Sequence, residues 1–492
     1  MPADQSTLVL RADAGPKIGA GHVMRVLAIG EEWIRLGGVV HLLSSALPAG
    51  LAKRCSDLGI RLQQLKAAPG SPGDVTETGG LVNAASADLL VVDGYHLGRL
   101  PSIEIPTLAI DDFGIGGFTG AELLLDQNAG SSDQFYADSH ARLLLGPKYC
   151  LLRREFLARR SEETEVRETI GRILVTLGGA DPDNVTSRIL DTIGDEGPAD
   201  RRIDVVIGAA NQHRDQIEAA AAGLRQSVSL HDNVTNMAEL MTAADLAIAA
   251  PGVTCWELAY LGVPMLLATL AENQRANGEF LFSRGIAQQL DFRSFRGDLA
   301  KISASRRLRQ DMRLRGMDLI DGRGLERVCR HLCARLVELR PATKADIREW
   351  WEWSNDPDVR AVSFSSDPIP WESHERWFRQ RLDDPDCRLL IAGDSAGTGF
   401  AQIRFDLDGN TALISISLAP GRRGQGRGTQ VIWTACDSLF RSSPIERIEA
   451  LIMPDNAASI RAFEKAGFVS AGETEVKQRP ARRFVLERGQ MK

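Results

Sequence analysis

The sequence predicts an α/β protein in which two parallel-sheet units precede a smaller α+β region. Short apolar runs alternate with helical stretches from residue 6 to about residue 155, and the same alternation resumes at residue 172. A third pattern, rich in tryptophan and then in strand-like runs, begins near residue 337. Alternating strands and helices are typical of parallel sheets. A chain of 492 residues is also too long for one hydrophobic core, so we expect several domains.

The expected domains are residues 1–158, 159–336 and 337–492, with the polar segment 159–168 as a hinge between the first two. The predicted strands of the first are Leu8–Ala12, Val39–Ser44, Leu89–Asp93 and Thr107–Asp111. Those of the second start at Arg172 and continue with Ile203–Gly208, Leu246–Ala250 and Met265–Thr269, before a helix at about 324–336. The third has helices at Ile347–Trp353 and Trp371–Leu382 and strands at Leu389–Ala392, Gly399–Phe405 and Ala412–Leu418.

Composition narrows the function classes. The 58 basic and 65 acidic residues leave a net charge of −7, which argues against a general nucleic-acid binder. No apolar run approaches the ~20 residues that span a bilayer, and the first residues lack the pattern of a signal peptide. Seven cysteines without Cys-x-x-Cys spacing indicate reduced thiols rather than disulfides or a zinc site. We therefore expect a cytoplasmic enzyme with no membrane partner.

The most informative segment is the loop that leads to His22. An apolar run ends at Asp13, a glycine-rich stretch follows, and His22 opens a predicted amphipathic helix. The start of a helix supplies backbone N–H donors and a positive dipole end, which can hold an anionic substrate and keep an imidazole neutral, as a general base requires. Taken alone, a Gly-x-Gly-His loop favours an ordinary βα turn.

The wider context favours a catalytic loop. Asp13, Lys17-Ile-Gly19-Ala-Gly21-His22 and Arg25 resemble the opening motif of the nucleotide-sugar hydrolases of pseudaminic acid biosynthesis. Further matches follow in the expected order over about two-thirds of the chain, at Val91–Tyr95, Ala109–Asp112, Leu125–Asn128 and Gly146–Arg153. The resemblance implies release of UDP from UDP-2,4-diacetamido-2,4,6-trideoxy-β-L-altropyranose. It also implies that His22 is catalytic and that Asp13, Lys17, Gly19, Gly21 and Arg25 bind the UDP-sugar.

A second glycine loop lies at Leu177–Asn184. Gly178 and Gly179 let backbone amides approach a diphosphate, and Asp183 or Asn184 can cap the helix that follows. The motif alone is equally compatible with a simple tight turn.

Two α/β units with a cleft between them are the architecture of the GT-B glycosyltransferase fold, in which ligands lie outside the carboxyl ends of the strands.

The segment Ala250–Pro264 resembles the nucleotide-binding element of GT-B enzymes that use UDP-sugars. The resemblance implies that Glu257 binds the ribose hydroxyls and that Gly252, Val253 and Thr254 lie near the diphosphate. Asn273 and Gln274 match the later loop that borders the sugar. No Asp-x-Asp element is evident, and helix ends can supply charge to the diphosphate, so we expect metal-independent chemistry.

The C-terminal region carries the Arg-x-x-Gly-x-Gly pattern of the GNAT acyltransferase superfamily between a predicted strand and helix. The resemblance implies an acetyl-CoA site at Leu418, Arg423, Gly424, Gln425, Gly426, Arg427 and Gly428. Successive backbone amides there can form an anion nest for the pyrophosphate, and Arg422, Arg423 and Arg427 are expected to add positive charge.

A second GNAT-like element follows about 30 residues later. Asn456, Ser459 and Phe463 lie in a helix that resembles the later acetyl-CoA-binding helix of that superfamily. Many relatives have a tyrosine at position 463 that protonates the leaving thiolate. A phenyl ring cannot donate a proton, so another residue, a water molecule or solvent must protonate coenzyme A.

Together these elements predict a bifunctional enzyme that N-acetylates a UDP-linked 4-amino sugar with acetyl-CoA and then hydrolyses the product. Two alternatives remain open from the sequence. The N-terminal region is compatible with a GT-B glycosyltransferase that uses a sugar acceptor in place of water. The GNAT domain is compatible with a protein N-acetyltransferase or with a regulatory module that binds acetyl-CoA.

Overall fold

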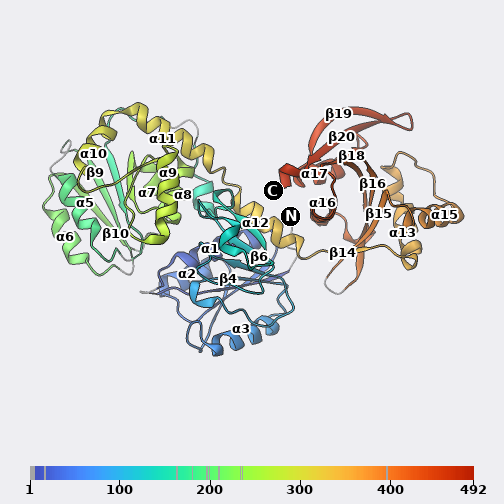
Figure 1. Cartoon of the computed structure of the whole chain (residues 1–492), viewed down its shortest axis with the longest axis horizontal. Helices are drawn as coiled ribbons and strands as arrows, with labels where there is room; N and C mark the ends of the chain where they lie inside the picture. The colour runs from blue at the N-terminus through green and yellow to red at the C-terminus, as the bar shows by residue number, and fades with distance from the viewer. Residues whose placement is uncertain are drawn as a thin grey trace. The chain divides into compact units, whose positions relative to one another are not determined.

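The fold is described from a computed structural model of the chain (Figure 1). The structure describes residues 6–491 apart from 16–17, 162–164, 180, 195–197, 199, 209–210, 233, 235 and 395–396. The described residues form two compact units, one ending at Cys329 and the other beginning at Arg330. The first unit holds two parallel sheets, and the second holds one mixed sheet. Part of the hinge expected over 159–168 lies outside the described residues.

The first sheet has parallel strands in the order β3-β2-β1-β4-β5-β6-β7 among the described residues. These strands are β1 (Thr7–Ala12), β2 (Val39–Ser44), β3 (Arg61–Gln64), β4 (Leu89–Asp93), β5 (Thr107–Ile110), β6 (Leu123–Asp126) and β7 (Arg142–Leu145). The accompanying helices are α1 (Gly21–Arg35), α2 (Ala49–Asp57), α3 (Pro72–Ala84) and α4 (Arg154–Leu157), with 3-10 turns η1 (Tyr95–Leu97), η2 (Asp133–Tyr136) and η3 (Pro147–Tyr149). The four strands predicted here are confirmed to within one residue at each end.

Burial explains why these segments are strands. Leu8, Val9 and Leu10 of β1 are all completely buried, as expected for a parallel sheet with helices on its faces. Helix α1 packs on β1, β2 and β4. Its buried Trp33 donates a hydrogen bond from Nε1 to the Ser6 carbonyl oxygen at 3.1 Å, which anchors the helix to the residue that precedes β1.

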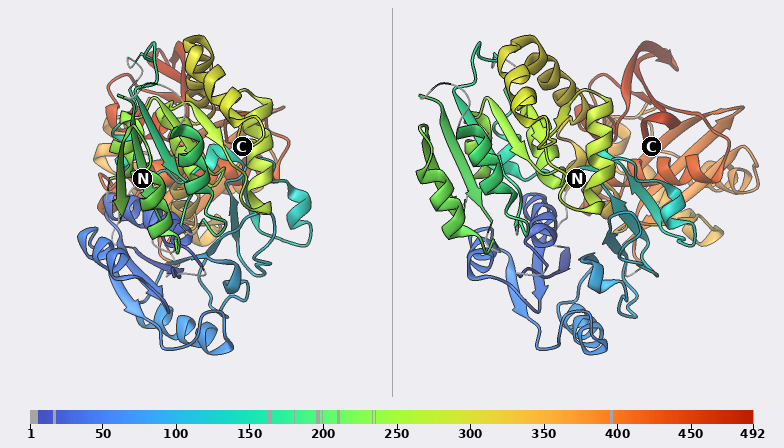
Figure 2. Two further views of the ribbon diagram at one scale, coloured as in Figure 1. Left: turned by 90° about the vertical axis from the view of Figure 1, so that its left-hand side faces the viewer. Right: turned by 60° about the vertical axis from the view of Figure 1, so that its left-hand side comes forward.

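The second sheet repeats this arrangement, with parallel strands in the order β10-β9-β8-β11-β12-β13. These strands are β8 (Arg172–Thr176), β9 (Arg202–Ile207), β10 (Ser227–Asp232), β11 (Leu246–Ala249), β12 (Met265–Leu267) and β13 (Ala287–Gln289). The helices are α5 (Val185–Gly194), α6 (Arg214–Ala222), α7 (Met237–Ala243), α8 (Val253–Leu261), α9 (Arg275–Ser283), α10 (Phe295–Ala304), α11 (Arg306–Leu319) and α12 (Gly324–Ala334), with the turn η4 (Glu272–Gln274). Figure 2 shows this sheet in green with helices on either side.

Both sheets reverse their strand order at one place. In the first sheet the reversal lies between β1 and β4, and in the second it lies between β8 and β11. The carboxyl ends of the strands on either side of such a reversal border the crevice in which open α/β sheets bind ligands. The loops that follow β1, β4, β8 and β11 are therefore the parts of this unit to search for a site.

The C-terminal unit is built on a mixed sheet in the order β14-β15-β16-β17-β18-β20-β19. Its strands are β14 (Glu338–Pro341), β15 (Cys387–Gly393), β16 (Gly399–Asp408), β17 (Thr411–Leu418), β18 (Arg447–Ile452), β19 (Val469–Val476) and β20 (Arg479–Glu487). Its helices are α13 (Ile347–Asn355), α14 (Pro357–Ala361), α15 (Trp371–Leu382), α16 (Arg427–Ser442) and α17 (Ala457–Lys465), with turns η5 (Lys344–Asp346), η6 (Pro420–Arg422) and η7 (Arg488–Met491). The three strands predicted here are present and extend up to three residues beyond the expected ends.

Two further features concern the whole described chain. All seven cysteines are buried, and none of them forms a disulfide. No helix among the described residues is long and apolar enough to cross a membrane.

Gly208, at the end of β9, provides a test of how the Gly178–Gly179 loop is supported. A Cβ atom at position 208 would lie 2.3 Å from the Gly178 carbonyl oxygen and 2.4 Å from that of Gly179. We expect Gly208→Ala to lower the free energy of unfolding by about 1–3 kcal/mol, the usual cost of overpacking. Denaturant unfolding monitored by circular dichroism measures this loss. Gly80→Ala in α3, where a Cβ meets open space, should be neutral or slightly stabilising; equal effects of the two variants would contradict the packing argument.

Candidate active sites

Acidic residues follow four neighbouring strands of the first sheet at its carboxyl edge. Asp13 follows β1, Asp93 ends β4, Asp112 lies just after β5, and Asp126 ends β6. All four side chains are buried. Buried carboxylates require partners, and the partners of these four residues build the site.

His22 is paired with Asp93 across the strand reversal. Its Nδ1 lies 2.7 Å from Asp93 Oδ1. The same Nδ1 lies 3.0 Å from Arg25 Nη2. In the tautomer that donates from Nδ1 to the Asp93 carboxylate, Nε2 of the imidazole is able to accept a proton. The ring also packs edge-on against Tyr95, with centroids 5.0 Å apart. His22 is thus oriented by two residues at the end of the neighbouring strand β4.

Arg25 lies one helical turn after His22 and joins Asp93 to Asp112. Its Nε and Nη2 donate to the two oxygens of Asp93, both at 2.8 Å, and its Nη1 donates to Asp112 at 2.9 and 3.1 Å. Burial lowers the pKa of Arg25, but the two carboxylates outweigh this effect and keep it raised. Burial raises the pKa of Asp112, whereas Arg25 and hydrogen bonds bring it down to about 2. The guanidinium is therefore a fixed structural charge.

Tyr95 and Asn128 complete the shell of Asp112. The Tyr95 hydroxyl donates to Asp112 Oδ2 at 2.6 Å, and Asn128 Nδ2 donates to Asp112 and, at 2.8 Å, to Asp126 Oδ1. Burial and the Asp112 carboxylate raise the pKa of Tyr95, so its hydroxyl keeps its proton. Tyr95 was part of a motif match in the sequence, but its contact with His22 follows only from the fold.

The same network reaches the second sheet of this unit. Asn277, on α9, donates from Nδ2 to Asn128 Oδ1 at 2.9 Å and to the Pro251 carbonyl oxygen at 3.3 Å. Its Oδ1 accepts from the Ala129 amide at 2.9 Å. Asn273, predicted to border the sugar, lies near enough to Tyr95 for its side chain to lower the pKa of the Tyr95 hydroxyl, against the larger effect of burial. The sequence-predicted residues His22 and Asn273 thus both lie beside Tyr95.

Asp13, predicted as a UDP-sugar ligand, has both of its oxygens engaged within the fold. Oδ1 accepts from Ser44 Oγ and from the Ser45 and Ala46 amides, and Oδ2 lies 2.8 Å from both His96 Nε2 and Arg11 Nη2. Burial raises the pKa of Asp13, but these partners hold it far below its usual value. Asp13 therefore fixes the start of the β1–α1 loop.

The rest of the β1–α1 loop is only partly described. Lys17 lies outside the described residues. Gly19 has φ = +79°, a conformation that favours glycine, and exchanges two backbone hydrogen bonds with Gly15 that close the loop. Gly21 is exposed at the first position of α1, a helix with no side-chain cap and no acidic residue in its first turn. Its backbone N–H groups are thus available to an anion.

The predicted nucleotide residues gather at the start of α8. Gly252 is the N-cap residue of this helix and has no side-chain cap, and Val253 and Thr254 form its partly exposed first turn. Glu257 lies one turn further on and is buried, with Oε1 accepting from Arg153 Nη2 at 3.0 Å. Burial raises the pKa of Glu257, and Arg153 partly offsets this effect. Arg153 ends a motif match in the sequence, but no local signal pointed to its pairing with Glu257.

The Gly178–Gly179 loop differs in one respect from expectation. Gly178 has φ = +89°, and a Cβ atom at either glycine would meet open space, as an anion-binding turn requires. The helix α5 is not capped by Asp183 or Asn184, so that prediction was wrong. Asp181 accepts from the Val185 and Thr186 amides at 2.8 and 2.9 Å. Asp181 adopts φ = +42°, which turns its carboxylate back onto the helix start.

Gln274 also has an internal partner, because its Oε1 accepts from the Leu270 amide at 2.9 Å.

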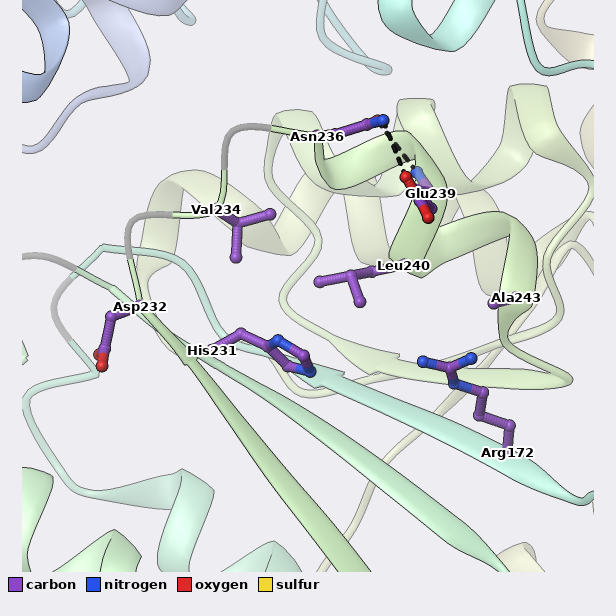
Figure 3. A pocket seen from close by; sticks show the side chains of 8 residues that line it. All are labelled: Arg172, His231, Asp232, Val234, Asn236, Glu239, Leu240 and Ala243. Carbon is purple, nitrogen blue, oxygen red and sulfur yellow. Dashed lines mark hydrogen bonds between the residues drawn. The ribbon is translucent and has the colours of Figure 1, made fainter.

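A hollow of about 410 Å³ opens beside α7 and is shown in Figure 3. Its polar walls are bonded to one another: Arg172 Nε and His231 Nε2 both contact Asp204, and Asn236 caps α7 at Glu239. None of the sequence-predicted site residues lines this hollow. No group of His, Cys, Asp or Glu suited to a metal is found in the described part of the chain.

In the C-terminal unit the two central strands separate. β17 and β18 are parallel and pair only at Thr411–Leu413 with Arg447–Glu449. Beyond Leu413 no pairing joins the described residues of these strands, so β17 from Ile414 to Leu418 is paired with β16 but not with β18. The predicted acetyl-CoA loop begins at the end of β17.

The backbone of that loop fits the predicted anion nest. Gly424 and Gly426 have φ of +75° and +73°, both in the left-handed region. Gly426 is the N-cap residue of α16, which has no side-chain cap and no acidic residue in its first turn. A Cβ atom at Gly428 would make only ordinary contacts with Leu418 and Ala462. The side chain of Gln425 bonds back to the Gly421 carbonyl oxygen at 3.3 Å.

The arginine side chains, in contrast, do not gather over the loop as expected. Arg423 donates to the Leu418 carbonyl oxygen at 3.0 Å and pairs with Asp356. Arg422 lies 3.5 Å from Asp394, and the Arg427 guanidinium lies over the Phe400 ring at 5.1 Å. The sequence pattern did not reveal these partners because they lie far away along the chain.

The later helix α17 is positioned by its own residues. Asn456 caps it by accepting from the Ser459 amide at 3.1 Å. Phe463 is buried and packs edge-on against Phe468, with ring centroids 4.9 Å apart. Phe463 therefore belongs to the core between α17 and the sheet.

Comparisons with known proteins agree with part of this picture. Residues 336–469 match the family model described as an acetyltransferase (GNAT) domain. An uncharacterised protein of Methanocaldococcus jannaschii is 22% identical over 495 residues, which cover 94% of this chain and 96% of that protein. Spore coat polysaccharide biosynthesis protein SpsG of Bacillus subtilis is 30% identical over 201 residues, which cover 39% of this chain and 58% of that protein.

A solved structure of spermidine N-acetyltransferase from Vibrio cholerae in complex with CoA and spermine is 17% identical to this chain. The match covers 32% of this chain and 98% of that one, with a TM-score of 0.30. The family match confirms the GNAT resemblance expected from the sequence. The C-terminal part of this chain is a GNAT acetyltransferase domain.

Proposed function

We propose that the chain is a bifunctional nucleotide-sugar enzyme. Its GNAT domain, residues 337–492, N-acetylates a UDP-linked 4-amino sugar with acetyl-CoA. The region before it, with domains 1–158 and 159–336 in a GT-B arrangement, hydrolyses UDP-2,4-diacetamido-2,4,6-trideoxy-β-L-altropyranose to UDP and the free sugar. The observation that carries the hydrolase is the His22–Asp93 pair at a strand reversal, connected by hydrogen bonds to the loop before α8. The similarity to a polysaccharide biosynthesis protein supports a sugar substrate.

In the proposed hydrolysis His22 is the general base. Asp93 holds the proton on Nδ1, so Nε2 removes a proton from a water molecule as the water oxygen bonds to the anomeric carbon. The bond between that carbon and the phosphate oxygen breaks, and UDP leaves with the bonding electrons. Arg25 binds both Asp93 and Asp112 and so fixes the carboxylate that orients His22.

The nucleotide is assigned to the second sheet. Glu257 accepts hydrogen bonds from the ribose hydroxyls, and the backbone amides at Gly252–Thr254 bind the diphosphate at the uncapped start of α8. The Gly178–Gly179 loop offers a second set of amides at the neighbouring strand end. Asn273 and Tyr95 border the sugar next to His22. Backbone dipoles supply the positive charge in this scheme, so hydrolysis needs no metal.

In the proposed acetylation the amide groups of the loop at 423–428 hold the pyrophosphate of acetyl-CoA. The acceptor amine attacks the thioester carbonyl carbon, the carbon–sulfur bond breaks, and coenzyme A leaves as a thiolate. The amine loses one proton and the thiolate gains one. Phe463 is buried and cannot supply a proton, so the proton comes from another residue, water or solvent.

Two incubations test the proposal. In the first, the full chain is incubated with the diacetylated UDP-sugar, and release of UDP is measured. In the second, the full chain is incubated with the free-amine precursor and acetyl-CoA, and release of coenzyme A is measured. Release of UDP without an added acceptor supports the hydrolase, whereas release only with a sugar acceptor indicates a glycosyltransferase. Coenzyme A release with a protein amine but not with the sugar amine contradicts the sugar acetyltransferase, and acetyl-CoA binding without turnover indicates a regulatory module.

Replacement of His22 tests the general base. We expect His22→Ala to lower the hydrolysis rate about 10²–10⁴-fold, the usual loss for a positioned base, while the affinity for UDP stays near normal. Initial rates of UDP release and calorimetric UDP titration measure the two effects. His140→Ala, at an exposed histidine, is the control and should hydrolyse normally. Near-normal hydrolysis by folded His22→Ala would remove His22 from this role.

Replacement of Glu257 tests the ribose contact. Glu257→Gln keeps the shape of the side chain but loses charge-assisted hydrogen bonds worth about 1.5–3 kcal/mol, so UDP affinity should fall at least about tenfold. Acetyl-CoA affinity should not change. Glu279→Gln, at an exposed position on α9, is the matched control. If Glu257→Gln binds UDP as tightly as the unaltered chain, the carboxylate does not hold the ribose.

Replacement of Gly426 tests the independence of the two activities. Its φ of +73° is strained for valine, and a side chain would occupy the path of the pyrophosphate, so Gly426→Val should abolish acetylation. Hydrolysis of already acetylated UDP-sugar should continue at the normal rate. Gly421→Val, in the same loop but with open space around its Cβ, should retain acetylation. Loss of both activities in folded Gly426→Val would show that the two reactions are coupled.

A further inference from the structure

Arg423 is tied to a distant segment of the C-terminal unit. Its Nη1 lies 2.5 Å from Asp356 Oδ1 and 3.3 Å from Asp358 Oδ2, and its Nε donates to the Leu418 carbonyl oxygen. The Arg423 and Asp356 side chains are only 25% and 14% exposed, whereas Asp358 is 89% exposed. The guanidinium thus spans the end of β17 and the start of α14, with Asp356 as its well-packed partner.

Asp356 has a second task at the same place. Its Oδ1 accepts from the Asp358 and Val359 amides at 3.1 and 3.4 Å and so caps α14. Burial raises the pKa of Asp356, but the hydrogen bond and charge of Arg423 outweigh burial and lower it. The carboxylate therefore stays charged and connects the helix start to Arg423.

The segment that begins at Asp356 is closed at its base. Asn355 accepts from the Ile369 amide at 2.7 Å and donates to the Ile369 carbonyl oxygen at 3.0 Å. Trp351 Nε1 donates to the same carbonyl at 2.7 Å. Residues 356–369 thus form a loop pinned to α13, and this pinned loop contacts Arg423 through the partly buried Asp356 and the exposed Asp358.

We propose that Asp356 is a positioning residue for acetyl-CoA, acting through Arg423. The pair fixes the first residue of the stretch 423–428 before the ligand arrives, so that the following amides already point into the nest. This inference rests on the proposed function of that stretch as the pyrophosphate site. It gives the Nη1 and Nε groups of Arg423 an internal role within the fold.

The physical reason is conformational entropy. Glycine loses more conformational freedom than other residues when its backbone is fixed, and Gly424 and Gly426 follow Arg423 within three residues. A loop ordered only by the ligand would subtract that cost from the binding free energy. When the Asp356–Arg423 pair orders the loop during folding, this entropy loss is no longer subtracted from the binding free energy. The amides are then preorganised for the ligand.

Asp356→Asn separates the charge from the cap, because asparagine caps helices as well as aspartate does. We expect Asp356→Asn to raise the acetyl-CoA dissociation constant, measured by calorimetry with the full chain, at least about tenfold through loss of a charge-assisted hydrogen bond. The KM for acetyl-CoA should rise in parallel, with little change in kcat at saturation. Asp367→Asn, at an exposed aspartate of the same segment, is the control.

A double-mutant cycle tests whether Asp356 affects acetyl-CoA binding through Arg423. In an Arg423→Met background, Asp356→Asn should have no further effect on acetyl-CoA affinity, because its partner is already absent. Additive losses from the two changes would overturn the proposal, as would unchanged affinity in Asp356→Asn. If the unaltered chain fails to bind acetyl-CoA, the result contradicts the proposed function of the loop at 423–428 itself. Equal melting temperatures of Asp356→Asn and the unaltered chain confirm that the cap is intact.

Discussion

The N-terminal site depends on one buried cation. Arg25 donates from its guanidinium nitrogens to Asp93 and Asp112, and three further residues of the site attach to these two carboxylates. His22 is held by Asp93, while Tyr95 and Asn128 are held by Asp112. Removing a buried charge from such a network leaves its partners uncompensated, which usually costs several kcal/mol. Arg25 therefore stabilises the fold as well as the geometry of the site.

The same network explains how two separate sheets can share a site. Each sheet by itself brings two loops together at its own strand reversal. Asn277 contacts Asn128, Ala129 and Pro251, and so joins the β6 end of one sheet to the loop that precedes α8 in the other. Amide side chains suit this junction because each carries a donor and an acceptor. The junction is neutral, so it adds no charge beside the proposed diphosphate site.

The sequence predicts the local parts of this structure well and the long-range parts poorly. The buried strands β1, β2, β4 and β5 are continuous apolar runs, and their prediction is confirmed. β10 was missed because its residues are at most half-buried and alternate polar with apolar types, and β13 was missed because two of its three residues are glutamines. The glycine loops and His22 follow from local patterns.

Side-chain partners do not follow from local patterns. Asp181 displaced the expected caps because it adopts a left-handed conformation. Arg423 is paired with a residue 67 positions earlier in the chain, and Arg153 with one 104 positions later. Such pairs depend on how the strands are ordered in the sheet. Among the site residues predicted from the sequence, those expected to bind the ligand through their backbone lie in suitable loops, whereas several expected to bind through their side chains are engaged within the fold.

The contrast between engaged side chains and accessible backbone amides clarifies how a chain with net charge −7 can accept anionic ligands. Arg25, Arg153 and Arg423 are each bound to carboxylates of the chain itself. The helices α1, α8 and α16 have neither a side-chain cap nor an acidic residue in their first turns, and each begins beside a glycine. Their backbone amides carry partial positive charge that needs no counterion and does not titrate. The arginines fix the loops, and the helix starts are the positions proposed to bind the phosphates.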